Sequence, residues 1–469
     1  MSSGQPLPTP PSEEGGSERL HPALQAIAKA TRGTAFEGDL WLVGGAVRDE
    51  LLGKPHSNDF DIVTRGSSAE LAQLLFEQGI STIAPVTYER FGTAMVEVGE
   101  VKIEIVTARR ESYDPESRKP NVEPATLEED ARRRDFTVNA LLKNLHTGEL
   151  IDPLQTGLID LKNGVLRTPL DPAATFHDDP LRMLRAIRFR WQLGFKPVKG
   201  LYESIRAEAV RLKIISAERI KDEFVKMLGL PDARDAVRDL MELGLIHQFA
   251  PEFEEMRGVE QGHFHHLDVW EHTLLVLKNA GHDDPTLSLG ALFHDIGKPR
   301  TRTIDKEGHT RFFGHETVGA QMTYEIMRRL KFPQRDVDLV KMLVKNHMRL
   351  GSSPEFTPAA ARRLLRDLDD QVERLLALVE ADAGGLKKGV KALDLQPIRR
   401  RLAEVRKATP RKVLESPLSG EEIMDLLSLE SGPEVGRWKT FLTEKVLEGE
   451  LVPGDRETAR NMLLSASNP

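Results

Sequence analysis

A pair of glycines and a pair of aspartates near the start of the chain constrain its fold more than any other feature. The run Leu42-Val43-Gly44-Gly45-Ala46-Val47-Arg48 indicates a buried strand that turns into a helix. The glycines let backbone approach a bulky ligand, and the helix start turns free N–H groups toward the same place, as at a phosphate site. Asp59 and Asp61 lie two apart on the next expected strand, so both carboxylates leave one face. Two such carboxylates repel each other unless a divalent cation neutralises them, and Mg²⁺ bridged to substrate phosphates is the usual solution.

Composition narrows the class of protein. A chain of 469 residues predicts two to four domains rather than one core. The absence of cysteine excludes disulfides and thiolate metal sites and fits a reducing cytoplasm. No apolar run reaches membrane-spanning length, and Met1 to Glu18 has the composition of a disordered tail rather than a signal peptide. The net charge is −8, yet residues 180–226 hold twelve Lys or Arg against five Asp or Glu, so RNA binding is not excluded.

Hydrophobic periodicity predicts the next elements of the chain. An amphipathic helix over Ala69 to Gly79 should bury Leu71, Leu74, Leu75 and Phe76. Phe91 to Val98 and Val101 to Val106 read as a hairpin that turns at Gly99-Glu100. Residues 110–127 are polar, contain three prolines, and predict a long loop. Leu127 to Leu141 predicts a helix on which Arg134 shares a face with Val138, and Asp135 shares the next face with Asn139.

Several of these stretches resemble one enzyme family. The strand, Gly-Gly, helix and Asp-x-Asp pattern is similar to the head of the polymerase-β-like nucleotidyltransferases. The form GGAVRDELLG…DFDIV resembles the branch that contains CCA-adding tRNA nucleotidyltransferases and bacterial poly(A) polymerases, and RRDFTVNAL resembles the second motif of that branch. Tyr113, Arg118, Pro120 and Val122 resemble the loop that CCA-adding enzymes place between head motifs, which the family links to the switch from C to A addition.

The resemblance implies roles for individual residues. Gly44, Gly45 and Arg48 are expected to bind the nucleotide, and Glu104 is expected to join Asp59 and Asp61 as a third acid of the Mg²⁺ site; its alternative is an exposed strand glutamate. Arg134 and Asp135 are expected at the phosphates and sugar of the nucleotide, and Asn139 near the ribose.

The segment Phe176 to Arg185 carries the expectation about the base. A carboxylate and a guanidinium three residues apart on a helix offer an acceptor and a donor, and C and A each present a donor beside an acceptor. The family reads Glu-Asp-x-x-Arg where this chain has Asp178-Asp179-x-x-Arg182, so base selection is placed on Asp179 and Arg182. Arg185 and Arg188 continue the basic face. The simpler alternative is a helix start, with Asp179 as N-cap, Pro180 as the first helical residue and an Asp178–Arg182 pair.

Histidines gather from residue 262 onward. They include His263, His265 and His266, and the order His272, His294-Asp295, Asp382 resembles the H…HD…D pattern of HD phosphohydrolases. His315 and His347 match additional ligands of that group. Imidazole and carboxylate donors suit Mn²⁺, Ni²⁺, Co²⁺ or Zn²⁺, so a divalent transition metal is expected here. For any one of these histidines, a satisfied core or surface residue is the alternative, and retained hydrolytic activity is left open.

The fold class expected from the whole is α+β: a polymerase-β-like nucleotidyltransferase head with a mixed sheet, then all-helical neck, HD and tail domains. The expected ranges are a disordered tail over 1–20, the head over 21–165, the neck over 166–235, the HD domain over 236–390 and a helical tRNA-binding tail over 391–469. The expected partners are the tRNA 3′ end, CTP and ATP, with no membrane; no sequence feature specifies an oligomeric state.

The expected function is template-independent addition of all or part of the CCA end to tRNA. Four alternatives stay open: a poly(A) polymerase, a split CC-adding or A-adding enzyme, an HD phosphohydrolase with a secondary or inactive head, and an RNA-binding protein without catalysis. Intact Asp59 and Asp61 argue against the last two.

Overall fold

The computed structural model describes residues 20–55, 58–112, 121–261, 267–350, 356–385, 393–408 and 414–466. The expected disordered segment up to residue 19, Tyr113, Arg118, Pro120, and the three histidines of residues 262–266 lie outside the described residues. The chain forms two compact units, Met1–Pro251 and Glu252–Pro469. The neck boundary expected after residue 235 falls inside a helix of the first unit, Ala233–Glu242.

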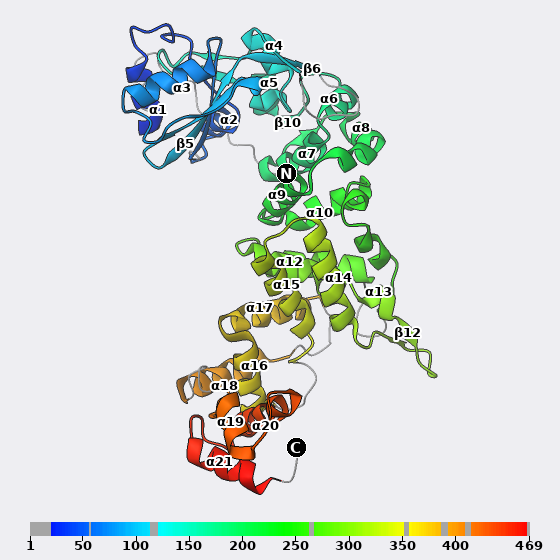
Figure 1. Cartoon of the computed structure of the whole chain (residues 1–469). Helices are drawn as coiled ribbons and strands as arrows, with labels where there is room; N and C mark the ends of the chain where they lie inside the picture. The colour runs from blue at the N-terminus through cyan, green and yellow to red at the C-terminus, as the bar shows by residue number, and fades with distance from the viewer. Residues whose placement is uncertain are drawn as a thin grey trace. The chain divides into compact units, whose positions relative to one another are not determined.

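A seven-stranded mixed sheet forms the head of the first unit (Figure 1). In spatial order its strands are β3 Val86–Tyr88, β4 Thr93–Val98, β5 Val101–Thr107, β2 Asp59–Thr64, β1 Trp41–Val43, β8 Leu142–Asn144 and β9 Leu150–Ile151. The two expected strands around the glycines and the expected hairpin turning at Gly99-Glu100 are all present. β2 runs parallel to β5 and places Asp61 directly opposite Glu104, while β1 runs antiparallel to β2 and places Val43 opposite Asp61. The acidic residues are therefore fixed by strand register in the middle of the sheet.

Short helices surround this sheet. They are α1 Pro22–Ala30, α2 Gly45–Leu51, α3 Ser68–Glu77, α4 Leu127–Arg132 and α5 Gly157–Asn163. The helix expected over 69–79 corresponds to α3, and Leu71 and Leu75 are fully buried as expected. Phe76 is a correction, because its side chain is 39% exposed. It follows Leu75 by one residue, which turns it about 100° away from the buried stripe of a helix with 3.6 residues per turn.

Residues 110–127 are not one loop. Their ends form a two-stranded ribbon, β6 Arg109–Ser112 and β7 Asn121–Pro124. Arg110 lies opposite Glu123, and the two side chains form an ion pair of 2.6 Å. Opposite charges across a strand pair stabilise pairing without any apolar alternation, which is why hydrophobic periodicity did not reveal these strands.

The helix expected over 127–141 is also shorter than predicted. α4 begins with a capping box between Thr126 and Glu129 and ends at Arg132. Residues Thr137–Asn139 form a separate turn of 3₁₀ helix, η2. Between the two, the Asp135 carboxylate accepts the amide of Phe136 at 2.8 Å, a local bond that competes with continuation of the helix.

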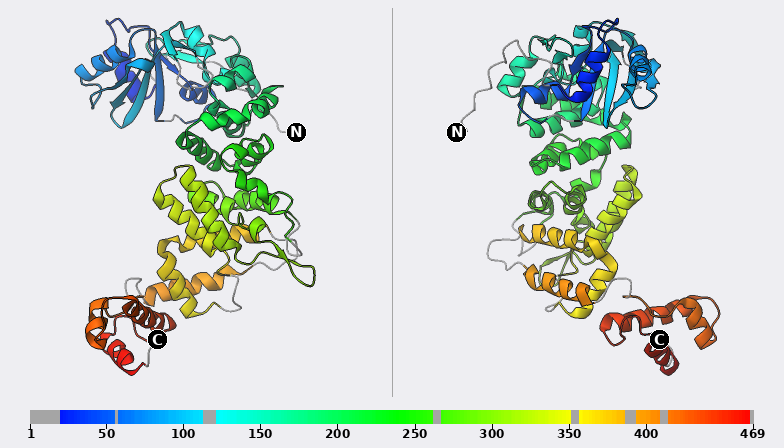
Figure 2. Two further views of the ribbon diagram at one scale, coloured as in Figure 1. Left: turned by 45° about the vertical axis from the view of Figure 1, so that its right-hand side comes forward. Right: turned by 90° about the vertical axis from the view of Figure 1, so that its left-hand side faces the viewer.

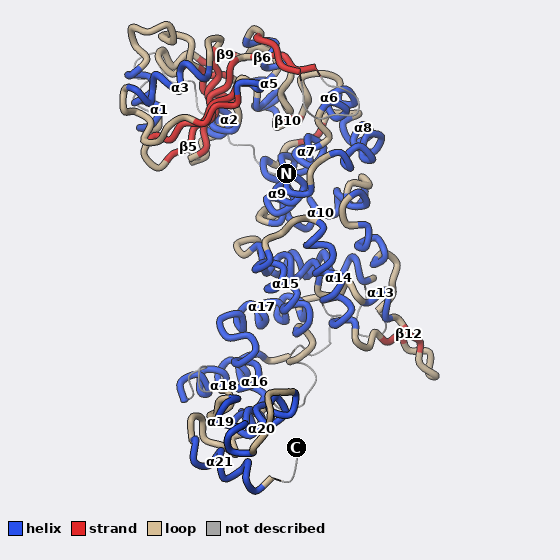
Figure 3. The backbone as a smooth tube through the Cα atoms, viewed as in Figure 1, coloured by secondary structure: helices blue, strands red, loops and turns tan. Residues whose placement is uncertain are grey.

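From residue 165 the first unit contains one short parallel strand pair, β10 Val165–Leu166 and β11 Lys196–Pro197, and its other regular elements are helices (Figures 2 and 3). The helices are α6 Pro172–Asp178, α7 Leu181–Leu193, α8 Leu201–Glu208, α9 Ala217–Leu228 and α10 Ala233–Glu242. α7 begins one residue later than expected, with Pro180 as its N-cap residue. The Asp179 carboxylate still accepts the amide of Leu181 at 3.1 Å, so it satisfies one of the free amides at this helix start.

In the described residues of the second unit, the strands are those of one small hairpin, β12 Thr303–Ile304 and β13 Thr310–Arg311, and the other regular elements are helices. Its helices are α11 Val269–Ala280, α12 Pro285–Phe293, α13 Lys298–Thr301, α14 His315–Arg329, α15 Gln334–Asn346, α16 Pro358–Leu368, α17 Val372–Ala383, α18 Leu395–Ala408, α19 Gly420–Leu427, α20 Pro433–Glu448 and α21 Arg456–Ser465. A continuous apolar core that includes Val276, Leu375 and Leu442 joins the helices of the HD segment to those of the expected tail. Within the described ranges, none of the helices combines the length and apolar character needed to cross a bilayer.

Candidate functional site

A cavity of about 490 Å³ lies in the first unit, against the glycine and aspartate motifs. Residues from the head and from the helices that follow it line this cavity: Val43, Gly44, Gly45, Ala46, Arg48, Asp49, Asp59, Asp61, Arg134, Asp135, Asn139, Arg185, Arg188, Phe189, Gln192, Lys226 and Leu230. The structure therefore brings together most of the head and neck residues that the sequence singled out, although the first and last of them, Gly44 and Arg188, are 144 positions apart in the chain.

The acidic side of the cavity is built by strand register and a glycine turn. Burial, followed by the charge of Glu104, raises the pKa of Asp61 to about 6, and Asp59 adds to the effect. Gly44 has φ 78°, and a Cβ at this position would lie 3.3 Å from Oδ2 of Asp61. Neighbouring carboxylates disfavour one another's ionised form, and a bound cation removes that penalty. Carboxylate oxygens that line a cavity therefore suit a hard divalent cation such as Mg²⁺. Glu104 lies beside Asp61 on the neighbouring strand but does not itself line the cavity.

The cavity also has a cationic lining, and the charges of Arg134 and Arg185 act on the Asp61 carboxyl. Arg134 comes from the turn after α4, and Arg185 and Arg188 come from one face of α7. The buried carboxylate of Glu223 on α9 accepts from Nε of Arg188 at 2.6 Å and lies 3.8 Å from Arg185. Carboxylates and guanidiniums that line one cavity give a site that can hold a cation together with a polyanion.

Asp135 and Asn139 line the cavity but direct their polar atoms toward other side chains. Asp135 accepts from Nδ2 of Asn139 at 3.0 Å and from Nε of Arg185 at 2.7 Å. Burial alone would raise the pKa of Asp135, but the Arg185 charge and these bonds hold it at about 2. Asn139 in turn accepts from Nη1 of Arg48 at 2.7 Å. Asn139 and Asp135 therefore connect Arg48 of α2 to Arg185 of α7.

The two residues expected to select the base lie outside the cavity lining. Asp179 pairs with Arg219 of α9 at 3.2 Å. Arg182 is buried, and its guanidinium donates to the carbonyl of Arg133 and, at 3.5 Å, to the carbonyl of Thr175. The described conformation thus places Arg182 behind the cationic wall, in contact with the peptide that precedes Arg134.

Sequence reasoning did not single out several cavity residues. Gln192 accepts from Nη1 of Arg188 at 2.7 Å, and Phe189 packs under that guanidinium with 4.1 Å between the guanidinium carbon and the ring centre. Lys226, 61% exposed, adds a further cation to the wall from α9. The spacing Arg185, Arg188, Gln192 on one helix face could have indicated Gln192; Lys226 and the supporting Glu223 depend on how α9 packs on α7, which no local pattern reveals.

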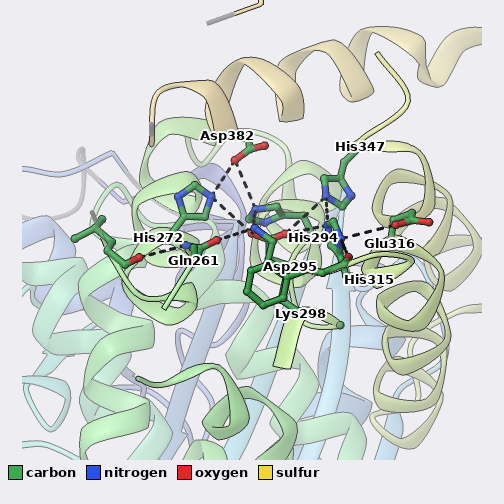
Figure 4. A network of polar contacts seen from close by, with 12 residues as sticks. Gln261, His272, His294, Asp295, Lys298, His315, Glu316, His347 and Asp382 are labelled. Carbon is green, nitrogen blue, oxygen red and sulfur yellow. Dashed lines mark hydrogen bonds and ion pairs between the residues drawn. The ribbon is translucent and has the colours of Figure 1, made fainter. Parts of the chain in front are cut away.

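The second cluster lies in the second unit and contains all six expected HD residues (Figure 4). His272 comes from α11, Asp382 from α17, and His294 and Asp295 follow the end of α12. Two groups have ligand atoms within 4.8 Å of one another: His272, His294 and Asp382, and Asp295, His315 and His347. Asp295 joins them, because Oδ2 lies 3.1 Å from Nε2 of His294 and Oδ1 lies 3.4 Å from Nε2 of His315.

The orientation of the histidines suits a metal. Nδ1 of His294, His315 and His347 lies 2.7 Å, 2.8 Å and 2.7 Å, respectively, from the backbone carbonyl three residues earlier. Nδ1 therefore carries the proton, and the Nε2 lone pair is left to ligate an ion. Burial, together with the charge of His294, lowers the pKa of His347 to about 4, which keeps this imidazole neutral. The Lys298 ammonium lies 2.6 Å from Asp295. Four imidazoles and two carboxylates, arranged in two groups that Asp295 bridges, form a donor set that fits transition metal binding.

Models of known protein families match the segments of the chain that contain the two candidate sites. Family models match three segments: "Poly A polymerase head domain" over residues 40–167, "Probable RNA and SrmB- binding site of polymerase A" over 194–257, and "HD domain" over 264–383. The A-adding tRNA nucleotidyltransferase of Deinococcus radiodurans is 36% identical, over 87% of this chain and 92% of its own length.

Two further proteins are similar to the chain over most of its length. The CC-adding tRNA nucleotidyltransferase of Thermus thermophilus is 34% identical, over 91% of this chain and 93% of its own length. The crystal structure of the Bacillus stearothermophilus CCA-adding enzyme in complex with CTP shares the fold with a TM-score of 0.67 at 23% identity, over 95% of this chain and 98% of that one. By its similarity to curated relatives along nearly their whole length, the chain belongs to the family of tRNA nucleotidyltransferases.

Proposed function

We propose that this chain transfers C, A or both from CTP and ATP to the 3′ end of tRNA without a template. The observation that carries the proposal is a cavity lined by Asp59 and Asp61 together with three arginines, Arg134, Arg185 and Arg188. A nucleoside triphosphate needs a divalent cation on its phosphates and a cationic surface for the remaining charge, and this cavity offers both.

The residues of the cavity suggest how the transfer proceeds. The 3′-hydroxyl oxygen of the RNA bonds to the α-phosphorus while the bond to the pyrophosphate oxygen breaks and the hydroxyl proton is released. Asp59 and Asp61, with Glu104 beside them, would hold Mg²⁺, and the bound ion would supply charge neutralisation and a lower pKa for the attacking hydroxyl. Arg134, Arg185 and Lys226 bind the triphosphate. Asp135 and Asn139, whose side chains bond to arginines, act by fixing Arg48 and Arg185 rather than by contacting the sugar.

Base selection by Asp179 and Arg182 stays a prediction. The contact between Arg182 and the Arg133 carbonyl supports an influence on the neighbouring Arg134, whereas direct contact with a base requires the arginine to leave its buried position. Replacing Arg182 by alanine should let UTP or GTP compete with the correct nucleotides by about 1 to 3 kcal/mol of lost discrimination, the worth of a bidentate base contact. A mutant that slows all four nucleotides equally would assign Arg182 to structural support instead.

The extent of addition is the finer question, because relatives at 36% and 34% identity are named A-adding and CC-adding, respectively. The deciding assay offers CTP, ATP or both to tRNA transcripts that end before CCA, after the first C, or after CC. Extension of all three transcripts to CCA supports complete addition. Activity confined to the transcript ending in CC, with ATP, supports an A-adding enzyme, and long A tracts would support a poly(A) polymerase.

We also propose a phosphohydrolase function for the second unit, favoured by the metal-ligand cluster around Asp295. His272, His294, Asp295, His315, His347 and Asp382 would hold a transition metal ion that activates water for attack on a phosphoester. Hydrolysis of p-nitrophenyl phosphate or of its bis-ester, measured after removal of metal and addition of Mn²⁺, Ni²⁺, Co²⁺ or Mg²⁺, tests the proposal. Failure of every metal to support hydrolysis would overturn it.

A further inference from the structure

The buried carboxylate of Asp130 accepts hydrogen bonds from two consecutive arginines of the first unit, Arg133 and Arg134. Asp130, on α4, is 1% exposed. Its Oδ1 accepts from Nε and Nη2 of Arg133 at 2.9 Å and 2.6 Å, and its Oδ2 accepts from Nε and Nη2 of Arg134 at 3.1 Å and 2.9 Å. Two donors of each guanidinium are therefore fixed by the Asp130 carboxylate, and Nη1 of Arg134 takes no part in these bonds. Arg134 is the member of this pair that lines the cavity.

The Asp130 carboxylate also contacts the first residue of strand β6, Arg109, in the β6–β7 hairpin. The backbone amide of Arg109, the first residue of β6, donates to Oδ1 of Asp130 at 3.3 Å. Nε of Arg133 donates to the carbonyl of Arg109 at 3.2 Å, so both polar groups of this residue's backbone meet the cluster. The carbonyl of Arg133 in turn accepts from the buried guanidinium of Arg182 on α7. Asp130 thus stands where the hairpin, the cavity wall and α7 meet.

The charge balance of this cluster depends on Asp130. Burial would raise the pKa of its carboxyl, but the charges of Arg134 and Arg133 hold the pKa below its ordinary value, so the group is ionised. An asparagine has nearly the same shape but carries one acceptor oxygen and no charge. It could retain one guanidinium at most, and the other would be left in a buried site without its counter-ion.

We infer that Asp130 is a positioning residue for nucleotide binding. It holds Arg134 on the cavity wall at the place required by the triphosphate of the incoming nucleotide, and it links that arginine to the hairpin and to Arg182. This role rests on the proposed nucleotidyl transfer and adds a residue that does not itself line the cavity.

The expected signature is a change in KM rather than a loss of active protein. Replacing Asp130 by asparagine should raise the KM for CTP or ATP about tenfold while kcat changes by less than about threefold, because a triphosphate contact made in both ground and transition states affects binding alone. A purely structural role predicts the opposite: fewer active molecules, a lower kcat and an unchanged KM. Direct binding of CTP or ATP with Mg²⁺, measured by calorimetry, should weaken by the same factor.

A double-mutant cycle identifies the residue through which Asp130 acts. If Asp130 works through Arg134, the variant Asp130→Asn/Arg134→Ala should have the same KM as Arg134→Ala alone. Arg133→Ala keeps the hydrogen bonds between Asp130 and Arg134 and should therefore change KM much less. Asp39→Asn is the matched control, because Asp39 also accepts from one guanidinium and one backbone amide, both of Arg65, and lies outside the cavity lining. If Asp130→Asn does not fold, Asp130→Glu keeps the charge, displaces it by one methylene, and carries the same test.

The outcomes separate this inference from the proposed function. A wild type that binds and adds nucleotide, with Asp130→Asn showing an unchanged KM or an effect that multiplies with that of Arg134→Ala, overturns the inference alone. A wild type that binds neither CTP nor ATP overturns the proposed function and this inference with it. A KM increase that is absent in Asp39→Asn and not additive with Arg134→Ala establishes the positioning role.

Discussion

Asp61 combines half-burial in a sheet with two acidic neighbours, Glu104 across the strand pair and Asp59 two residues away. A carboxyl group whose pKa is raised to about 6 costs stability when it ionises, unless a cation offsets the repulsion. Opposite these acids, Asp135 has the reverse setting, because Arg185 and Asn139 stabilise its ionised form. At the scale of single residues, the cavity therefore has one acid that requires an added cation and another that the protein itself neutralises.

Replacing Asp59 or Asp61 by alanine should abolish nucleotide addition while the protein stays folded. Loss of transition-state charge stabilisation of this kind costs on the order of 10² to 10³ in rate or more. Single-turnover addition to a tRNA transcript measures the rate, thermal melting reports the folded state, and Asp39→Asn serves as a carboxylate control outside the cavity. Addition near the wild-type rate by Asp59→Ala would show that the cavity is not the site of transfer.

The buried Asp135 should give the protein an acid-labile share of its stability. Its folded pKa of about 2 lies below the ordinary 3.8, so the unfolded chain binds more protons between these values and stability rises with pH there. The contribution, about 2 kcal/mol from a shift of this size, is full above pH 3.8 and is lost as the pH falls through about 2. Urea unfolding of wild type and Asp135→Asn from pH 7 downward should show a difference that is constant to about pH 4 and then shrinks. A difference independent of pH would contradict the assigned ionisation.

At the scale of elements, the unit of strand β1, the glycine turn and α2 places backbone against the acids of β2. Gly44 adopts φ 78° and leaves only 3.3 Å between a built Cβ and Oδ2 of Asp61. Gly53, just after the same helix, adopts φ 67° with nothing within 4 Å of a built Cβ. Both glycines thus have a positive φ, but only at Gly44 would a side chain also approach a residue of the candidate site.

Gly44→Ala and Gly53→Ala should each destabilise the protein by about 1 kcal/mol or more, since alanine is strained at positive φ. Gly44→Ala should cost more, because its ψ of −140° lies in a region that essentially only glycine adopts. Only Gly44→Ala should lower the rate of addition, by about tenfold, because the added methyl displaces Asp61 and a small misplacement of a reacting group is costly. Melting temperatures and kcat measured on both variants give the comparison. Equal loss of activity in the two would indicate a general effect of helix stability.

Elements specified by neighbouring residues could be predicted from sequence, and those specified by distant contacts could not. Apolar runs bounded by glycine were enough for β1, β2, β4 and β5. β6 and β7 pair through charged residues, so their strands lack apolar alternation. The 127–141 helix ends early because Asp135 binds the amide of the following residue, a preference that periodicity does not register.

The candidate sites follow the same rule. Chemically distinctive residues, such as Asp59, His294 and Asp295, could be assigned from their types and order, and the structure places them in one cavity and one cluster. Residues whose position depends on helix packing were missed, as with Lys226. The same packing places Arg182 outside the cavity lining, against the carbonyl of Arg133, which its sequence position does not reveal. Sequence order identifies reactive groups, whereas the packing of α9 on α7 decides which neighbours support them.

At the scale of the whole molecule, the chain carries two candidate metal centres in separate compact units. The first consists of oxygen ligands and faces a cationic wall suited to a triphosphate. The second mixes imidazoles with carboxylates and has no need of a nucleotide to complete it. Because hard and borderline ions prefer different donor sets, the two activities should respond to different metals.

Replacing His294 by alanine should leave nucleotide addition almost unchanged and abolish phosphoester hydrolysis, because it removes a ligand of the second centre only. Asp59→Ala should do the reverse. In the wild type, Mn²⁺, Ni²⁺ or Co²⁺ should restore hydrolysis to metal-free protein far better than Mg²⁺, whereas Mg²⁺ should suffice for addition. Both reactions are assayed on the same preparations, with folding checked by thermal melting. If His294→Ala and Asp59→Ala remove one common activity, the centres do not act separately, and a single reaction must depend on both units.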